Sequence, residues 1–195
     1  LWGGLLKSRK SAALPGAKIY PPTLTNSDLA NIKIAKEMGV TGVMQPFVRD
    51  HSDLECVKEA LREAGAEDIR LFAKIENMDG VRKLEKLLPA ADEIVIARGD
   101  LGNAVHLWDL PGVQRQIAEK CRAAGKPFMV VTQMLASMER SPVPTRAEVN
   151  DIFHAVMDGA ASIMVTGETA VGDYPVEVIR YMVNTVRSAE KEENR

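Results

Sequence analysis

Several features that would assign a protein to a class at once are scarce in these 195 residues. Only two cysteines occur, Cys56 and Cys121, and they lie far apart within helix-like patterns. This favours reduced packing residues of a cytoplasmic protein over a disulfide or a metal pair. The formal net charge of -2 offers no basic surface for nucleic acid, and no apolar run is long enough to span a membrane. We therefore expect neither a nucleic-acid partner nor a membrane partner.

Common catalytic signatures are also missing. The sequence contains no Ser-His-Asp order, no zinc cluster and no Walker-type phosphate loop. Its three histidines, His51, His106 and His154, have no ligand-like spacing and fall in loop or helix contexts. We treat them as non-catalytic, so any chemistry must come from other residue types.

What the chain does contain is a regular alternation of short apolar runs and helix-length segments. Five runs are too short and too continuous for amphipathic helices, and they fit buried parallel strands. These runs are TGVMQPFV, IRLFAKIE, DEIVIAR, KPFMVVTQM and SIMVTGE. Their ends recur at a spacing close to the roughly 31 residues per unit of an eight-stranded barrel.

The fold class predicted is therefore α/β. We interpret the chain as part of a (β/α)8 TIM barrel, of which it supplies about five strand–helix units and leaves the ring incomplete. An open doubly wound sheet is the alternative, because strict alternation alone permits both. Capping boxes predict helix starts at Thr25, Ser52 and Thr145. Glycines predict helix ends at Gly39, Gly65 and Gly125.

Polar and charged residues gather where the predicted strands end. They are Lys74, Glu76, Arg98, Asp100, Thr132, Gln133, Thr166 and Glu168. Because α/β enzymes build their sites at the carboxyl ends of parallel strands, this placement predicts an enzyme.

The segment LFAKIENMDG places Lys74 and Glu76 two residues apart on one predicted strand. Successive strand side chains alternate between faces, so both charges should face one side while Leu71, Ala73 and Ile75 pack against helices. The pair could hold a divalent cation and an anion, and a structural ion pair at a strand end is the equally weighted alternative.

Asp100 follows the next predicted strand, one unit after Glu76. Two carboxylates from adjacent strands could share Mg²⁺, which typically takes one or two carboxylates and completes its shell with water and substrate oxygens. Gly99 would let backbone N–H groups approach an anion. The alternative is a plain turn in which Asp100 caps a helix.

Thr132 ends the fourth apolar run. Its hydroxyl could bind a substrate carboxylate or organise a proton-carrying water, although a satisfied hydroxyl beside a core strand is the more frequent explanation. The segment PTRAE has a complete structural interpretation as a helix cap.

Five longer segments together resemble the pyruvate kinase family. They are GGLLKSRKSAALPG, LFAKIENMDGV, IVIARGDLG, GKPFMVVTQMLASMERSPVPTRAEVND and AVMDGAASIMVTGETAVGDYPVE. The resemblance covers nearly the whole chain in the family's order. It implies a (β/α)8 barrel and transfer of a phosphoryl group from phosphoenolpyruvate to ADP, giving pyruvate and ATP.

The resemblance also implies roles for individual residues. Lys74 matches the lysine that steadies the phosphoryl group and the enolate oxygen. Glu76 and Asp100 match the ligands of Mg²⁺ or Mn²⁺. Gly99 and Asp100, with Thr132, match the cradle of the substrate carboxylate. A potassium ion is also implied, but its ligands lie on strands that this chain does not contain.

The resemblance further implies that the chain is one piece of a larger, usually tetrameric enzyme. Residues 1–16 would be the return limb from a lid domain, residues 17–190 the later part of the barrel, and residues 191–195 a tail toward a C-terminal domain. We expect the isolated chain to be inactive. Pro46 departs from the family, which usually has a small hydroxyl residue there, so a nucleotide or ion contact is in question.

Two other functions remain open from the sequence. One is a Mg²⁺-dependent aldolase or lyase on a related barrel, against which TQMLASM and GETA argue. The other is a non-catalytic fragment that binds a partner through open strand edges.

Overall fold

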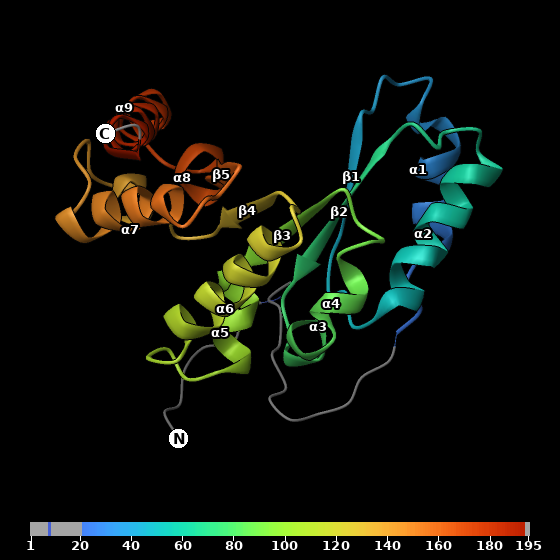
Figure 1. Cartoon of the computed structure of the whole chain (residues 1–195). Coiled ribbons are helices and arrows are strands. Elements are labelled where there is room, and N and C mark those ends of the chain that lie inside the picture. Colours follow the sequence, from blue (N-terminus) through green and yellow to red (C-terminus); the bar gives the residue numbers. More distant parts are fainter. Residues whose placement is uncertain (1–7, 9–20, 194–195) are drawn as a thin grey trace.

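The computed structural model describes Ser8 and residues 21–193. Within this part, five parallel strands form one sheet in chain order. The strands are β1 (Gly42–Gln45), β2 (Arg70–Ile75), β3 (Glu93–Ala97), β4 (Phe128–Val131) and β5 (Ser162–Met164). All five coincide with the predicted runs, and β1 and β5 form the two ends of the sheet without closing a ring (Figure 1). The α/β prediction and the incomplete barrel are confirmed.

Helices follow each strand, as a barrel requires. Figure 1 shows them in sequence order, from α1 and α2 beside β1 to α7 and α9 beside β5. They are α1 (Asn26–Ala35), α2 (His51–Glu63), α3 (Met78–Arg82), α4 (Leu84–Leu87), α5 (Arg98–Ala104), α6 (Leu110–Ala123), α7 (Arg146–Met157), α8 (Gly167–Ala170), α9 (Pro175–Glu193) and the 3-10 helix η1 (Ala136–Glu139).

The two faces of the sheet have different surroundings. Leu71, Ala73 and Ile75 of β2 belong to the main hydrophobic core beneath the helices, as alternation predicted. The opposite face carries a small separate cluster, built on Val95, Ala97 and Val131, with Phe72, Met129 and Met164 only partly buried against it. The second face is therefore the one that a complete ring would enclose.

Two of the three predicted capping boxes are present. Thr25 pairs with Asp28 at the start of α1, and Thr145 pairs with Glu148 at the start of α7. The prediction for Ser52 was wrong: α2 begins at His51 and is capped by Asp50, whose box partner is Asp53. Asp and Ser are equally good caps, so the neighbouring acid displaced the expected start by two positions.

The predicted helix ends are confirmed by backbone geometry. Gly39, Gly65 and Gly125 all have φ between 60° and 73°, the left-handed conformation that glycine adopts without a steric penalty.

Some expectations fall differently or lie outside the described residues. The predicted limb over residues 1–16 lies outside them except for Ser8, as does the end of the predicted tail. Cys121 is buried in α6, but Cys56 is exposed on α2, so the expectation that both are packing residues was wrong for Cys56. Among the described residues, no helix combines the length and apolarity needed to cross a membrane.

Candidate active site at the strand ends

The carboxyl end of β2 carries a buried ion pair. The Lys74 Nζ lies 2.8 Å from the Glu76 Oε1, and the Glu76 side chain is only 1% exposed. The second carboxylate oxygen, Oε2, accepts a hydrogen bond of 2.7 Å from the backbone N–H of Phe47. The Lys74 side chain is 25% exposed. The pair thus joins a buried carboxylate, with a partner on each oxygen, to a lysine side chain that is only partly buried.

Strand β2 ends at Ile75 because the residues that follow form the cap of the next helix. Asn77 caps α3: its Oδ1 accepts a hydrogen bond from the Gly80 N–H at 2.9 Å, and its Nδ2 donates to the Val48 carbonyl at 3.1 Å. A Cβ at Gly80 would lie 2.7 Å from that carbonyl, so only glycine fits the approach. Glu76 is therefore held between a strand and a capped turn.

The loop after β1 contributes a backbone donor that the sequence did not predict. Phe47 has φ of 52°, an uncommon conformation for a residue with a side chain, and its N–H points to Glu76. Pro46, the departure noted above, directly precedes it, and its carbonyl accepts a hydrogen bond from Gln45 Nε2 at 3.1 Å. This departure therefore adjoins the Glu76 contact.

Asp100 lies in the first turn of α5, directly after β3. It is exposed, and its side chain forms no hydrogen bond or ion pair within the described residues. Ala97, not Asp100, is the N-cap of α5, so the alternative role as a cap is wrong. The register pairs Ile75 with Ile96, so Glu76 and Asp100 follow neighbouring strands at the same edge of the sheet.

Glu76 and Asp100 are the two carboxylates at this edge of the sheet that are candidates for binding a divalent cation. In the described part of the chain, no three His, Cys, Asp or Glu side chains could together hold a metal. A site here would use the Glu76 and Asp100 carboxylates and would take its other ligands from water and substrate, as Mg²⁺ commonly does.

Thr132 packs directly against the backbone of Gly99. A Cβ on Gly99 would lie 2.9 Å from Thr132 Cγ2 and 3.6 Å from its Oγ1. Thr132 and the next residue, Gln133, have φ of 80° and 55°. The structure thus brings two of the predicted substrate-binding residues into contact.

Glu168, one of the polar residues at the predicted strand ends, is a buried anchor of the neighbouring loop. Its Oε2 accepts a hydrogen bond from the Thr166 N–H at 2.7 Å, and its Oε1 accepts one from the Leu135 N–H at 3.2 Å. Burial favours the neutral acid, but backbone N–H groups, including that of Met134, outweigh it and lower the pKa of Glu168. The carboxylate therefore holds the loop after β4.

The comparisons with known proteins agree with this geometry. A family model described as the barrel domain of pyruvate kinase matches residues 1–179. The chain belongs to the pyruvate kinase family. Pyruvate kinase of Bacillus licheniformis is 42% identical over 188 residues, which are 96% of this chain and 32% of the relative. Pyruvate kinase PKLR of Homo sapiens is also 42% identical over 188 residues, 96% of this chain and 33% of the relative.

A third relative, pyruvate kinase of Dictyostelium discoideum, is 42% identical over 185 residues, 95% of this chain and 36% of the relative. The chain thus spans about a third of the length of these members of the pyruvate kinase family.

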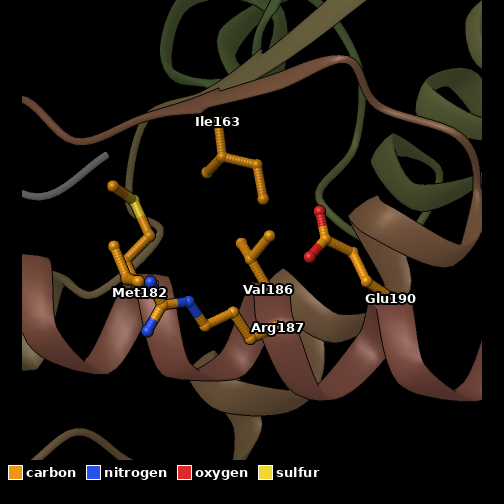
Figure 2. A pocket seen from close by; sticks show the side chains of 6 residues that line it. Ile163, Met182, Val186, Arg187 and Glu190 are labelled. Carbon is orange, nitrogen blue, oxygen red and sulfur yellow. The ribbon is translucent and has the colours of Figure 1, made fainter.

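Two hollows of the surface lie away from the strand ends. One, of about 260 Å³, lies between β5 and α9 and is lined by Ile163, Met182, Val186 and neighbours (Figure 2). The other, of about 450 Å³, is lined by α7 and Tyr181. Neither is lined by a predicted site residue, because the strand ends sit on an open sheet and not inside the closed ring of a complete pyruvate kinase barrel.

The three histidines form no hydrogen bond, ion pair or ring contact with a predicted site residue in the described part of the chain. His106 stacks on Trp108 with ring centroids 4.6 Å apart, and His154 Nδ1 lies 2.8 Å from the Asn150 carbonyl oxygen. His51 lies 3.6 Å from Glu55.

Sequence reasoning missed one residue that reaches this region from a helix. Both carboxylate oxygens of Asp151 in α7 accept from one nitrogen of Arg98, Nη1, and the other guanidinium nitrogens of Arg98 donate to the Thr132 carbonyl. Asp151 is 53 positions from Arg98, and no local pattern links the two. The sequence offers one signal for the role of Asp151: a charged residue on the inward side of the helix that follows β4.

Proposed function

We propose that the protein containing this chain transfers a phosphoryl group from phosphoenolpyruvate to ADP, yielding pyruvate and ATP. The observation that carries the proposal is the Lys74–Glu76 pair at the end of β2, with Asp100 exposed after the neighbouring strand. One cation and two carboxylates at this edge suit a highly charged phosphate ester better than an apolar substrate.

Lys74 is suited to charge neutralisation. Glu76 orients the Lys74 ammonium, and the Lys74 side chain is only partly buried. Phosphoryl transfer demands little covalent chemistry from the protein and much positioning and electrostatic stabilisation. In this role Lys74 stabilises negative charge on the phosphoryl group in transit and on the enolate oxygen that its departure creates.

Glu76 and Asp100 are the residues that would hold Mg²⁺ or Mn²⁺. A divalent ion bound there would neutralise phosphate and enolate oxygens. Glu76 serves this role from a rigid, buried position, whereas Asp100 is free to turn toward the ligand from the first turn of α5. The potassium ion that the family implies would take its ligands from other strands.

Gly99, Asp100 and Thr132 form the proposed cradle for the substrate carboxylate. Gly99 exposes backbone at the start of α5, and Thr132 packs against it with its hydroxyl nearby. The Thr132 hydroxyl can donate a hydrogen bond to the carboxylate or to a water that delivers a proton to the methyl-forming carbon. Pyruvate results when that carbon takes up one proton.

The 195-residue chain alone is not expected to turn over substrate. The five strands of residues 21–193 leave one face of the sheet open, so water would reach the site. In the complete enzyme, we expect a homo-oligomer, with a tetramer as the state implied by the family.

The deciding experiment is an assay of the native-length protein from its own source. Pyruvate formation from phosphoenolpyruvate should require both ADP and Mg²⁺, and an intact mass should establish the polypeptide length. Pyruvate formed from oxaloacetate without ADP would instead support the aldolase or lyase. If the protein forms an assembly that shows no Mg²⁺-linked binding of oxalate, a non-catalytic role through the sheet edges is the better account.

A further inference from the structure

Two consecutive residues after β4 have an unfavourable backbone. Thr132 has φ of 80° and Gln133 has φ of 55°, and neither is glycine. Positive φ is a genuine outlier for a β-branched residue such as threonine. Such a conformation persists only where the surrounding structure holds it, and it is most common at functional sites. The question is which groups hold Thr132 in place.

One side of the loop is held by the guanidinium of Arg98. Its Nη2 donates to the Thr132 carbonyl at 2.8 Å, and its Nε lies 3.3 Å from the same oxygen. Nη2 also lies 2.8 Å from Met134 Sδ. The Arg98 side chain is only 13% exposed. The nearly buried guanidinium of Arg98 thus donates from two nitrogens to one carbonyl oxygen. Lysine cannot reproduce this geometry because its ammonium lacks the planar fork.

Arg98 is itself fixed by a helix. Its Nη1 lies 2.8 Å from Asp151 Oδ1 and 2.7 Å from Oδ2. Asp151 lies in α7, whose start is set by the capping box of Thr145 and Glu148. Glu148 also accepts hydrogen bonds from the backbone N–H and hydroxyl of Ser137. The helix that orients Arg98 is therefore tied to the same loop farther along the chain.

The other side of the loop is held by Glu168, which accepts the Leu135 N–H. The Thr132 carbonyl is thus bound by the guanidinium of Arg98, and the Leu135 N–H is bound by the buried carboxylate of Glu168. Since Thr132 also packs on Gly99, its side chain has little freedom once the carbonyl is held.

We propose that Arg98, anchored by Asp151, is a positioning residue that holds the Thr132 side chain in place beside Gly99. Arg98 acts through the Thr132 backbone and not through substrate, and α7 sets its orientation. The inference rests on the proposed function, because it assigns Thr132 a role in the phosphoenolpyruvate site.

The kinetic test uses the native-length protein and a double-mutant cycle. Arg98→Met should lower kcat about 100-fold, since misplacing a catalytic group by about 1 Å has an effect of that size, while KM for ADP stays within about twofold. In a Thr132→Ala background the same change should lower kcat far less, because the hydroxyl it positions is gone. Arg98→Lys should recover only part of the loss.

The matched control is Arg115→Met, which removes an exposed arginine that pairs with Glu119 on the surface of α6. It should leave kcat unchanged. Asp151→Asn provides a milder second variant if Arg98→Met fails to fold, and it should lower kcat in the same direction. Equal effects of Arg98→Met with and without the Thr132 hydroxyl would overturn the proposal.

A second test does not depend on activity. Amide hydrogen exchange over residues 132–135 should become faster in Arg98→Met and in Asp151→Asn, by more than the loss of global stability to urea in the same variants accounts for, and should stay slow in Arg115→Met. Unchanged exchange in this loop would overturn the proposal that Arg98 holds Thr132. If the wild-type protein makes no pyruvate, the proposed function fails, yet this measurement still decides whether Arg98 holds Thr132.

Discussion

Lys74 and Glu76 form a 2.8 Å ion pair in which the carboxylate is buried and the lysine side chain remains partly exposed. The other Glu76 oxygen is bound by the Phe47 N–H, so both oxygens have partners within the protein. Asp100, after the neighbouring strand, is exposed and has no such partner among the described residues. The two proposed metal ligands should therefore differ in how much they contribute to stability, which makes their roles separable by experiment.

Replacing either carboxylate should weaken metal binding, but only one replacement should affect folding. In the native-length protein, Asp100→Asn should lower Mg²⁺ affinity at least about tenfold at constant stability, since it removes one charged ligand and no internal contact. Glu76→Gln should lower the affinity and also reduce the free energy of unfolding by about 2 kcal/mol through loss of the ion pair.

Titration calorimetry with Mg²⁺ and urea unfolding measure the two effects. Asp109→Asn, an exposed aspartate without a side-chain capping bond, is the control and should change neither. Unchanged Mg²⁺ affinity in Asp100→Asn would remove Asp100 from the metal site.

Loss of the Lys74 ammonium should act on turnover more than on binding. Lys74→Met should lower kcat about 100-fold or more, with a smaller change in KM for phosphoenolpyruvate, because the charge it stabilises develops in the transition state. Steady-state kinetics on the native-length protein test this. Lys36→Met, which removes an exposed pair with Asp68, should leave kcat intact. A rise in KM alone, at unchanged kcat, would assign Lys74 to binding only.

A methyl group at Gly99 should displace Thr132, whereas the same change at Gly112 should stabilise α6. The Cβ of Gly99→Ala would lie 2.9 Å from Thr132 Cγ2, so the threonine must shift, and we expect kcat/KM for phosphoenolpyruvate to fall about tenfold. Gly112→Ala, where nothing lies within 4 Å, should stabilise α6 by up to about 1 kcal/mol without loss of activity. Thermal unfolding and kinetics of both variants provide the comparison; equal activity in the two would contradict the contact.

The contribution of Asp53 to the free energy of unfolding should be lost at acidic pH. Burial disfavours the charged form, but hydrogen bonds from Arg49 and Thr23 outweigh it and lower the pKa of Asp53 from 3.8 to about 2. Since the folded-state pKa is depressed, the folded protein binds fewer protons than the unfolded chain between these values. The stabilisation is present above pH 3.8 and is lost as the pH falls toward about 2.

Urea unfolding across this range measures the effect. Asp53→Asn should cost about 2 kcal/mol at neutral pH, and the deficit should shrink as the pH falls through the Asp53 range. A deficit that stays constant down to about pH 2 would rule out the assigned cause.

The secondary structure could be predicted from the sequence because strand and helix signals are local. Each of the five strands lies within a predicted apolar run, and Thr25 and Thr145 begin helices as their boxes predicted. The error at Ser52 came from two equally good caps, Asp50 and Ser52, two positions apart. Choosing between them requires the packing of α2, which a local pattern does not contain.

Alternation along β2 was sufficient to place Lys74 and Glu76 on one face, and the unit spacing placed Asp100 at the next strand end. These relationships follow from strand geometry and were determined by the sequence itself. Only the tertiary structure decided that Phe47 completes the Glu76 contacts, that Glu168 is an anchor, and that Asp151 holds Arg98 on the Thr132 carbonyl. The reason is physical: periodicity orients a side chain relative to its own element, whereas a contact across 53 residues exists only once separate elements have packed together.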